Sequence, residues 1–93
     1  MKFNSQICTT KEQSERLLDL RLKTETADMH IFDNEMYIPA WSLHRLLCLL
    51  PAEYFQIVMQ DFIFRPKEMY DKVINCIEIL IKESYFNKEY LEG

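Results

Sequence analysis

Hydrophobic and polar positions recur with helical spacing over residues 67–83, the clearest pattern in this 93-residue chain. The apolar positions follow a 3.6-residue period: they are Tyr70, Val73, Ile74, Ile77, Leu80 and Ile81. The opposite face is polar: it consists of Asp71, Asn75, Glu78 and Lys82. Glu78 and Lys82 have the spacing and order of a stabilising ion pair. The pattern therefore predicts an amphipathic helix over 67–83, followed by a short final turn that Asn87 caps.

A helix is also predicted over residues 10–22, where polar first turns lead into a leucine-rich end. Two overlapping capping boxes are available at its start, Thr9 with Glu12 and Thr10 with Gln13. Either pair would satisfy backbone amides that have no partner inside the helix. Only the C-terminal half of this helix carries enough apolar side chains to face a core.

A third helix is predicted over residues 40–50, between two prolines. Pro39 stands where proline favours a helix start, and Pro51 ends the helix because the residue before a proline avoids the α conformation. One apolar face has helical spacing: it consists of Leu43, Leu46, Leu47 and Leu50. A second stripe lies beside it: it consists of Trp41, His44, Arg45 and Cys48. A helix that is apolar over so much of its circumference is expected to be central and largely buried.

Two other segments are predicted as strands. Residues 29–38 form a hairpin around the turn residues 33–35, which requires Asp33 or Asn34 to adopt the turn geometry without a glycine. Residues 54–64 alternate with a period of two and give the strongest strand pattern, which Asp61 divides into a second hairpin or one bulged strand. The whole chain, residues 1–93, is thus predicted to be a single α+β domain in which about three helices pack on a small antiparallel sheet.

Composition excludes several classes of protein. The chain is 48% hydrophobic and 13% aromatic, which is too apolar for a disordered protein. Its only glycine is Gly93, so it contains no glycine-rich phosphate loop, dinucleotide-binding turn or GxSxG nucleophile elbow. With 15 acidic and 11 scattered basic residues the net charge is −4, which disfavours nucleic-acid binding.

The remaining sequence features bear on location. No apolar run has the length of a signal peptide or a membrane-spanning helix, so we expect a cytoplasmic protein with no membrane attachment. The three cysteines are an odd number without paired spacing, which is typical of free thiols in a reducing compartment.

His44 and Cys48 are the strongest candidates for chemistry, because residues four apart on a helix project in one direction, as two metal ligands must. A zinc site needs further ligands, and the other soft donors, His30, Cys8 and Cys76, have no ligand spacing. A helical cysteine beside leucines is more often a small buried hydrophobe. We therefore predict no catalytic residue, metal or cofactor, and keep as the alternative a small metal-dependent or enzymatic domain that uses His44, Cys48 and His30.

The stripe of Trp41, His44, Arg45 and Cys48 has a second interpretation, as a surface that binds a protein partner. Tryptophan and arginine are enriched at the energetic centres of interfaces. The competing interpretation is that Trp41 packs beneath the N-terminal segment and completes the core. The aromatic tail over residues 85–91 adds a candidate seam for a homodimer.

These features favour a non-enzymatic protein-interaction or regulatory module. A nucleic-acid-associated regulator is a further alternative, which would require a clustered basic face.

Several blocks of the chain resemble a family of small uncharacterised proteins of gut anaerobes and of their prophages and other mobile elements. The resemblance spans about two thirds of the chain as discontinuous blocks: they are residues 26–29, 39–43, 50–51, 70–71, 76–78 and 85–91. The resemblance implies a small accessory protein of mobile-element origin and assigns no catalytic residue. The family pattern has glycine where this chain has Arg21 and Ser84, just past two predicted helix ends, and a longer strand-rich insert before Tyr70.

Overall fold

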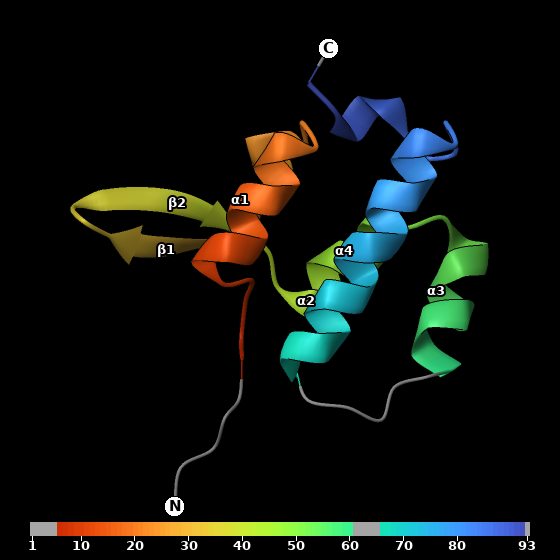
Figure 1. Ribbon diagram of the computed structural model, residues 1–93, viewed down its shortest axis with the longest axis horizontal. Helices are drawn as coiled ribbons and strands as arrows, with labels where there is room; N and C mark the ends of the chain where they lie inside the picture. Colours follow the sequence, from red (N-terminus) through yellow and green to blue (C-terminus); the bar gives the residue numbers. More distant parts are fainter. Residues whose placement is uncertain (1–5, 61–65, 93) are drawn as a thin grey trace, which may run out of the picture.

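The computed structural model describes residues 6–60 and 66–92, and within them the chain forms four α-helices and one two-stranded sheet (Figure 1). The elements in chain order are α1 (Lys11–Asp19), the 3-10 turn η1 (Thr24–Thr26), β1 (Met29–Asp33), β2 (Met36–Ala40), α2 (Leu43–Leu49), α3 (Ala52–Gln60), α4 (Pro66–Lys82) and the 3-10 turn η2 (Lys88–Tyr90). The predicted α+β class is confirmed, but the sheet is smaller and the helices more numerous than the sequence indicates.

Helix α4 provides the central face of the core, and the predicted helix over 67–83 is confirmed. Its apolar stripe packs against α2 and α1, and Trp41, Leu17 and Leu46 are fully buried in the same cluster. Figure 1 shows the hairpin of β1 and β2 projecting from the helical body on the side of α1 away from α4. Helix α1 therefore lies between the core helix and the hairpin.

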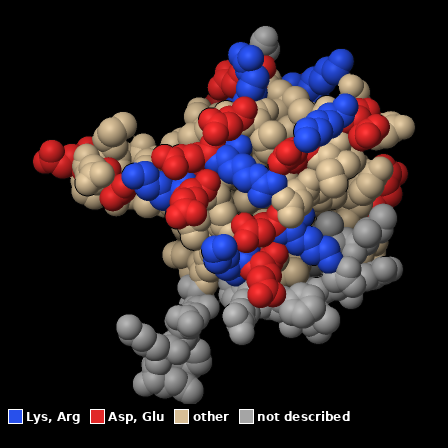
Figure 2. Space-filling model, viewed as in Figure 1, with Lys and Arg blue, Asp and Glu red and all other residues tan. Residues whose placement is uncertain are grey.

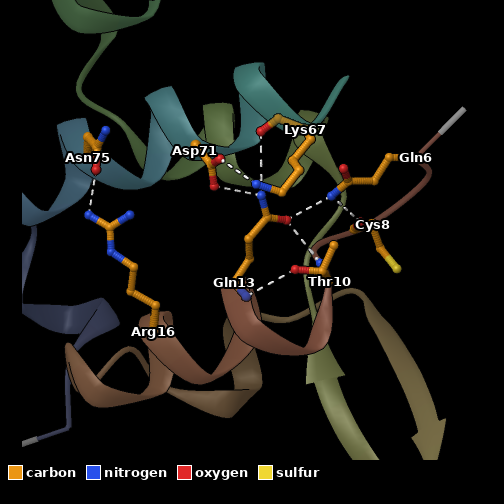
Figure 3. Close-up of polar contacts among 8 residues, drawn as sticks. All are labelled: Gln6, Cys8, Thr10, Gln13, Arg16, Lys67, Asp71 and Asn75. Carbon is orange, nitrogen blue, oxygen red and sulfur yellow. Dashed lines mark hydrogen bonds and ion pairs between the residues drawn. The ribbon is translucent and has the colours of Figure 1, made fainter. Parts of the chain in front are cut away.

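Helix α1 begins with the second of the two predicted capping boxes. The Gln13 amide N–H donates to Thr10 Oγ1 over 3.1 Å, and the Thr10 N–H donates to Gln13 Oε1 over 2.9 Å (Figure 3). Gln13 also reaches the polar face of α4, where its Nε2 donates to Asp71 Oδ1 over 2.7 Å. Arg16 completes this contact by pairing with Glu78 over 2.7 Å. The polar face of α4 is thus the face that orients α1.

Both α1 and α4 end in a left-handed residue that is not glycine. After α1, Arg21 has φ 71°, and its N–H donates to Leu18 O while the Leu22 N–H donates to Leu17 O. After α4, Ser84 has φ 63° and the same two bonds recur, from Ser84 to Ile81 and from Tyr85 to Leu80. This pair of bonds is the Schellman motif, in which glycine is the preferred left-handed residue. Arg21 and Ser84 are therefore two positions at which glycine would be favoured.

Ser84→Gly is expected to stabilise the protein by about 0.5–1 kcal/mol. A residue with a Cβ is destabilised by roughly 1–2 kcal/mol in the left-handed region, and glycine is not. Part of this gain is lost because glycine increases the conformational entropy of the unfolded chain. Urea unfolding followed by circular dichroism measures the change. Ser84→Ala, which keeps a Cβ, should leave the midpoint nearly unchanged. A lower midpoint for the glycine variant than for the alanine variant would contradict the left-handed helix end.

Two predictions made for the middle of the chain are wrong. The helix that follows the hairpin begins after Ser42, whose Oγ accepts the Arg45 N–H, and not at Pro39. Pro39 instead lies in β2 opposite His30, where an edge strand tolerates a proline. Pro51 does end this helix as predicted, since α2 stops at Leu49.

The predicted strand over 54–64 is the second error, because residues 52–60 form helix α3. Pro51 precedes this helix, and its carbonyl accepts the N–H groups of Tyr54 and Phe55, so the first turn forms directly after the proline. The alternation that suggested a strand also contains Val58 at a nominally polar position, which weakens a period of two. The rest of that prediction, residues 61–64, lies outside the described residues.

The predicted hairpin and the final turn are confirmed. Strands β1 and β2 pair antiparallel around Asn34 and Glu35, which have φ values of 50° and 62°. Two central residues with positive φ are typical of the type I′ turn of two-residue hairpins. At the other end of the chain, Asn87 Oδ1 accepts the Glu89 N–H at the start of η2.

Candidate functional site

The stripe predicted to bind a partner divides between the core and the surface. Trp41 has 0% exposure, and its Nε1 donates to Thr26 Oγ1 over 2.9 Å. Arg45 Nε donates to the carbonyl of the same threonine over 2.7 Å. The prediction of Trp41 as a docking residue is therefore wrong for the folded chain, and its interpretation as a core residue is confirmed. Trp41 and Arg45 together hold η1 against the start of α2.

His44 and Cys48 lie side by side on the exposed side of α2, with 3.5 Å between Cys48 Sγ and His44 Nε2. Their predicted common direction is confirmed. His30 does not join them to form a cluster of three potential ligands, and the described residues contain no such cluster elsewhere. His30 instead stands on β1, where its ring meets that of Tyr37 edge to face at 6.1 Å.

The other two cysteines are half-buried. Burial raises the pKa of the Cys76 thiol, and burial together with the negative charge of Asp28 raises the pKa of Cys8. A raised pKa lowers the thiolate fraction at neutral pH, so the environment of these two thiols does not favour nucleophilic chemistry.

A network of hydrogen-bonded side chains lies where the hairpin joins the helical body. We call this network the base: it consists of Thr26, Asp28, Trp41, Ser42 and Arg45. Asp28 stands just before β1, and its carboxylate accepts the Ser42 N–H over 2.8 Å and the Ser42 hydroxyl over 2.6 Å. Ser42 in turn caps α2. The chain entering the hairpin and the chain leaving it are therefore joined by side-chain hydrogen bonds.

The N-terminal segment fixes the base from a second direction. The Thr9 N–H donates to the Trp41 carbonyl over 2.8 Å, and the Trp41 N–H donates to Thr9 Oγ1 over 3.1 Å. Thr9 Oγ1 also bonds the hydroxyl of Ser14 in α1 at 2.7 Å. These bonds are buried, and they tie the end of β2 to helix α1.

Asp28 should make stability depend on acidity. Partial burial raises the pKa of its carboxyl, but the hydrogen bonds from Ser42 and the charge of Arg45 outweigh burial and hold the pKa below its ordinary value of 3.8. A lowered folded-state pKa contributes stability that is present above the ordinary value and is lost as the pH falls through the folded value. We expect the advantage of the native protein over Asp28→Asn in free energy of unfolding to shrink from about pH 6 to about pH 2. A difference that stays constant with pH would contradict this role.

The hairpin that rests on the base, residues Met29–Ala40, is here called the arm. In its register Ile31 lies opposite Ile38, and these side chains are half-buried on the face towards α1. The outer face presents the pairs Phe32 with Tyr37 and His30 with Pro39. Phe32 is 62% and Tyr37 72% exposed, and their ring centroids lie 4.9 Å apart. A hairpin with one solvated face normally carries polar residues there, so this outer face is unusual.

Sequence reasoning predicted the arm but did not identify its outer face. The available signal was the failure of alternation: Phe32 and Tyr37 occupy positions that a half-solvated strand gives to polar residues. This pattern assigns Phe32 and Tyr37 to the outer face only when the register of the hairpin is known, because a shift of one residue would exchange the two faces.

Two hollows are relevant to binding: one adjoins the arm, and the other is an alternative binding surface away from it. One, of about 360 Å³, lies between the arm and α1, and Lys11, Leu18 and Met36 are among its lining residues. Across it, Lys11 Nζ pairs with Asp33 over 3.0 Å. The other, of about 440 Å³, lies at the opposite end of the molecule along α4, and its mainly apolar lining includes Tyr54, Cys76 and the 67%-exposed Tyr85.

Charge is distributed unevenly between the arm and the helical body. The arm contains two acidic residues, Asp33 and Glu35, and no lysine or arginine; the wider segment 24–44 adds Glu25 and Asp28 and also contains no lysine or arginine. Since the chain has 15 acidic and 11 basic residues, the rest of it holds 11 of each. In Figure 2 the arm shows acidic atoms towards its tip, whereas the helical body shows acidic and basic side chains interspersed. The net charge of −4 is thus the charge of the segment that contains the arm.

No protein-family model, curated protein or solved structure matches this chain. The resemblance to the small proteins of gut anaerobes therefore stays a prediction. Among the described residues, no helix has the length and apolar character needed to cross a membrane.

Proposed function

We propose that this chain is a non-enzymatic protein-interaction module that docks a partner protein through the outer face of the arm. The observation that carries the proposal is the exposed pair of Phe32 and Tyr37 on that face, whose rings contact each other in a tilted arrangement. Aromatic side chains supply large apolar contact area with little conformational entropy to lose, and they are enriched at interface centres. An apolar cluster of this kind on a projecting element is typical of a surface that a partner covers.

The base supports the proposal because it restricts the arm before any partner binds. An isolated two-stranded hairpin is marginally stable in water. Here the bonds from Asp28 to Ser42 and from Trp41 to Thr9 hold both ends of the hairpin against the helical body. A surface fixed in its bound geometry loses less entropy on association. Trp41, Arg45 and Ser42 thus support the arm and do not themselves contact the partner.

The resemblance stated above extends the proposal to an accessory role, with an origin on a mobile element. That extension rests on the resemblance alone. A module of this kind acts by binding, so its activity should depend on the arm surface and not on a reactive side chain.

Site-specific photocrosslinking in the native host tests the proposal. A benzophenone amino acid in place of Tyr37 should yield one discrete adduct with a different protein, because the side chain is exposed on the proposed interface. Adding Phe32→Ser to the same chain should lower the yield about tenfold, as expected when a residue at an interface centre is lost.

The matched control places the same amino acid at Tyr85, an equally exposed aromatic in the hollow along α4. The proposal predicts no adduct of the same protein from that position. An adduct from position 85 with none from position 37 would overturn the assignment of the docking face.

A further inference from the structure

The charge of the arm indicates which kind of partner fits its outer face. We infer that the partner presents a basic segment, rich in lysine or arginine, and not a second copy of this chain. This inference rests on the proposed function, because it names the partner of the same surface.

The negative charge that remains after internal pairing favours a basic partner. Asp33 pairs with Lys11, and Asp28 lies near Arg45 and bonds Ser42. Glu25 and Glu35 are exposed and form no ion pair among the described residues. Glu35 lies in the turn at the tip of the arm. A ligand approaching along the arm therefore meets a negative potential that lysine or arginine would complement.

The chemistry of the aromatic pair also favours a basic partner. The exposed faces of Phe32 and Tyr37 are suited to the guanidinium of arginine or the ammonium of lysine, which bind over aromatic rings while their aliphatic stems cover apolar surface. The acidic residues and the two rings thus favour the same type of side chain. A partner with a neutral or acidic segment could pack on the two rings but would not complement the negative charge of the acidic residues.

The same charge argues against a homodimer through the arm. An isologous contact would bring together two copies of an arm that contains no lysine or arginine, each with a Glu35 that forms no ion pair among the described residues. Like charges at a shared interface are destabilising, so a second copy is the less favourable occupant. Nucleic acid is disfavoured for the same reason.

Selection from a random-peptide phage library provides the test, with the whole folded chain as the target and the double variant Phe32→Ser/Tyr37→Ser as the counter-target. We expect the enriched peptides to carry an excess of lysine and arginine, and to lose binding to the double variant at least about tenfold. For a synthetic copy of the best peptide, Glu35→Lys should weaken binding about fivefold, and added salt should weaken it further. Tyr85→Ser is the matched control and should leave the affinity unchanged.

Three outcomes would count against the inference, and they separate it from the proposed function. Neutral or acidic peptides whose binding requires Phe32 and Tyr37 would overturn the basic partner and leave the docking face intact. If sedimentation experiments showed that this chain forms a dimer, and if Phe32→Ser abolished that dimer, the occupant of the outer face would be a second copy of the chain and the inference would be wrong. Peptides whose binding ignores both aromatic residues would overturn the proposed function itself. Circular dichroism of each variant verifies that it is folded.

Discussion

Trp41→Ala is expected to cost about 3–5 kcal/mol in free energy of unfolding, the range for removing a buried aromatic side chain. Trp41 is fully buried among the core leucines, and it donates a hydrogen bond to Thr26. A domain of this size has roughly 5–14 kcal/mol of total stability, so the loss would unfold a large fraction of the protein in mild denaturant. Urea unfolding followed by circular dichroism measures the change, because the variant lacks the only tryptophan.

Trp41→Phe is the matched control for packing. It keeps most of the ring volume but removes the hydrogen bond to Thr26 and the five-membered ring of the indole, so it should cost about 1–2 kcal/mol. A Trp41→Ala variant within about 1 kcal/mol of the native protein would contradict the buried position and restore the interpretation of this residue as a surface anchor.

Gln13→Ala is expected to have the second-largest effect, about 2–3 kcal/mol. The side chain is buried and serves two purposes at once (Figure 3). Its oxygen accepts the Thr10 N–H in the capping box, and its nitrogen donates to the carboxylate of Asp71 on α4. A hydrogen bond to a charged group contributes about 1.5–3 kcal/mol, and a helix cap about 1 kcal/mol.

Thr10→Ala separates the two contributions. It removes the bond from the Gln13 N–H to the threonine hydroxyl and leaves the contact between α1 and α4 in place. We expect it to cost about 1 kcal/mol. If Gln13→Ala destabilised the protein no more than Thr10→Ala in the same urea titration, the bridge to Asp71 would contribute nothing to the docking of α1.

The predictions from sequence succeeded where one local pattern agreed with its tertiary setting. The helix α4 has an uninterrupted apolar stripe, and the hairpin has a turn residue, Asn34, that tolerates positive φ. The sequence of helix α3 predicts a strand because short apolar runs carry little period information, and that pattern does not include the helix start that Pro51 favours. Pro39 has the sequence context of a helix start, and its place in an edge strand depends on the pairing with His30, which is not a local feature.

The candidate site was harder to predict than the fold for a physical reason. Trp41 and Arg45 have the composition of an interface, but their partner is Thr26, 15 and 19 residues away in the same chain. Phe32 and Tyr37 have the composition of a core, yet the register of the hairpin turns them to the outside. Composition alone does not distinguish these cases, because burial is decided by contacts between distant segments.

The scarcity of glycine has a structural consequence. Arg21, Asn34, Glu35 and Ser84 all adopt positive φ, and they include both helix ends of the Schellman type and the tip of the arm. Glycine would relieve strain at such positions, but it would also increase the conformational entropy of the unfolded chain and the flexibility of the folded turn. At the arm, two residues with side chains give a stiffer turn than Asn-Gly would, which suits a preformed docking face.

An amide NMR footprint tests whether a partner covers the outer face of the arm. The labelled protein is titrated with the partner captured by crosslinking at position 37, or with the best selected peptide. We expect the shift changes to concentrate on Met29–Ala40, and we expect Phe32→Ser/Tyr37→Ser to remove them. Changes concentrated on residues 75–85 along α4, with the arm unaffected, would contradict the proposed docking face.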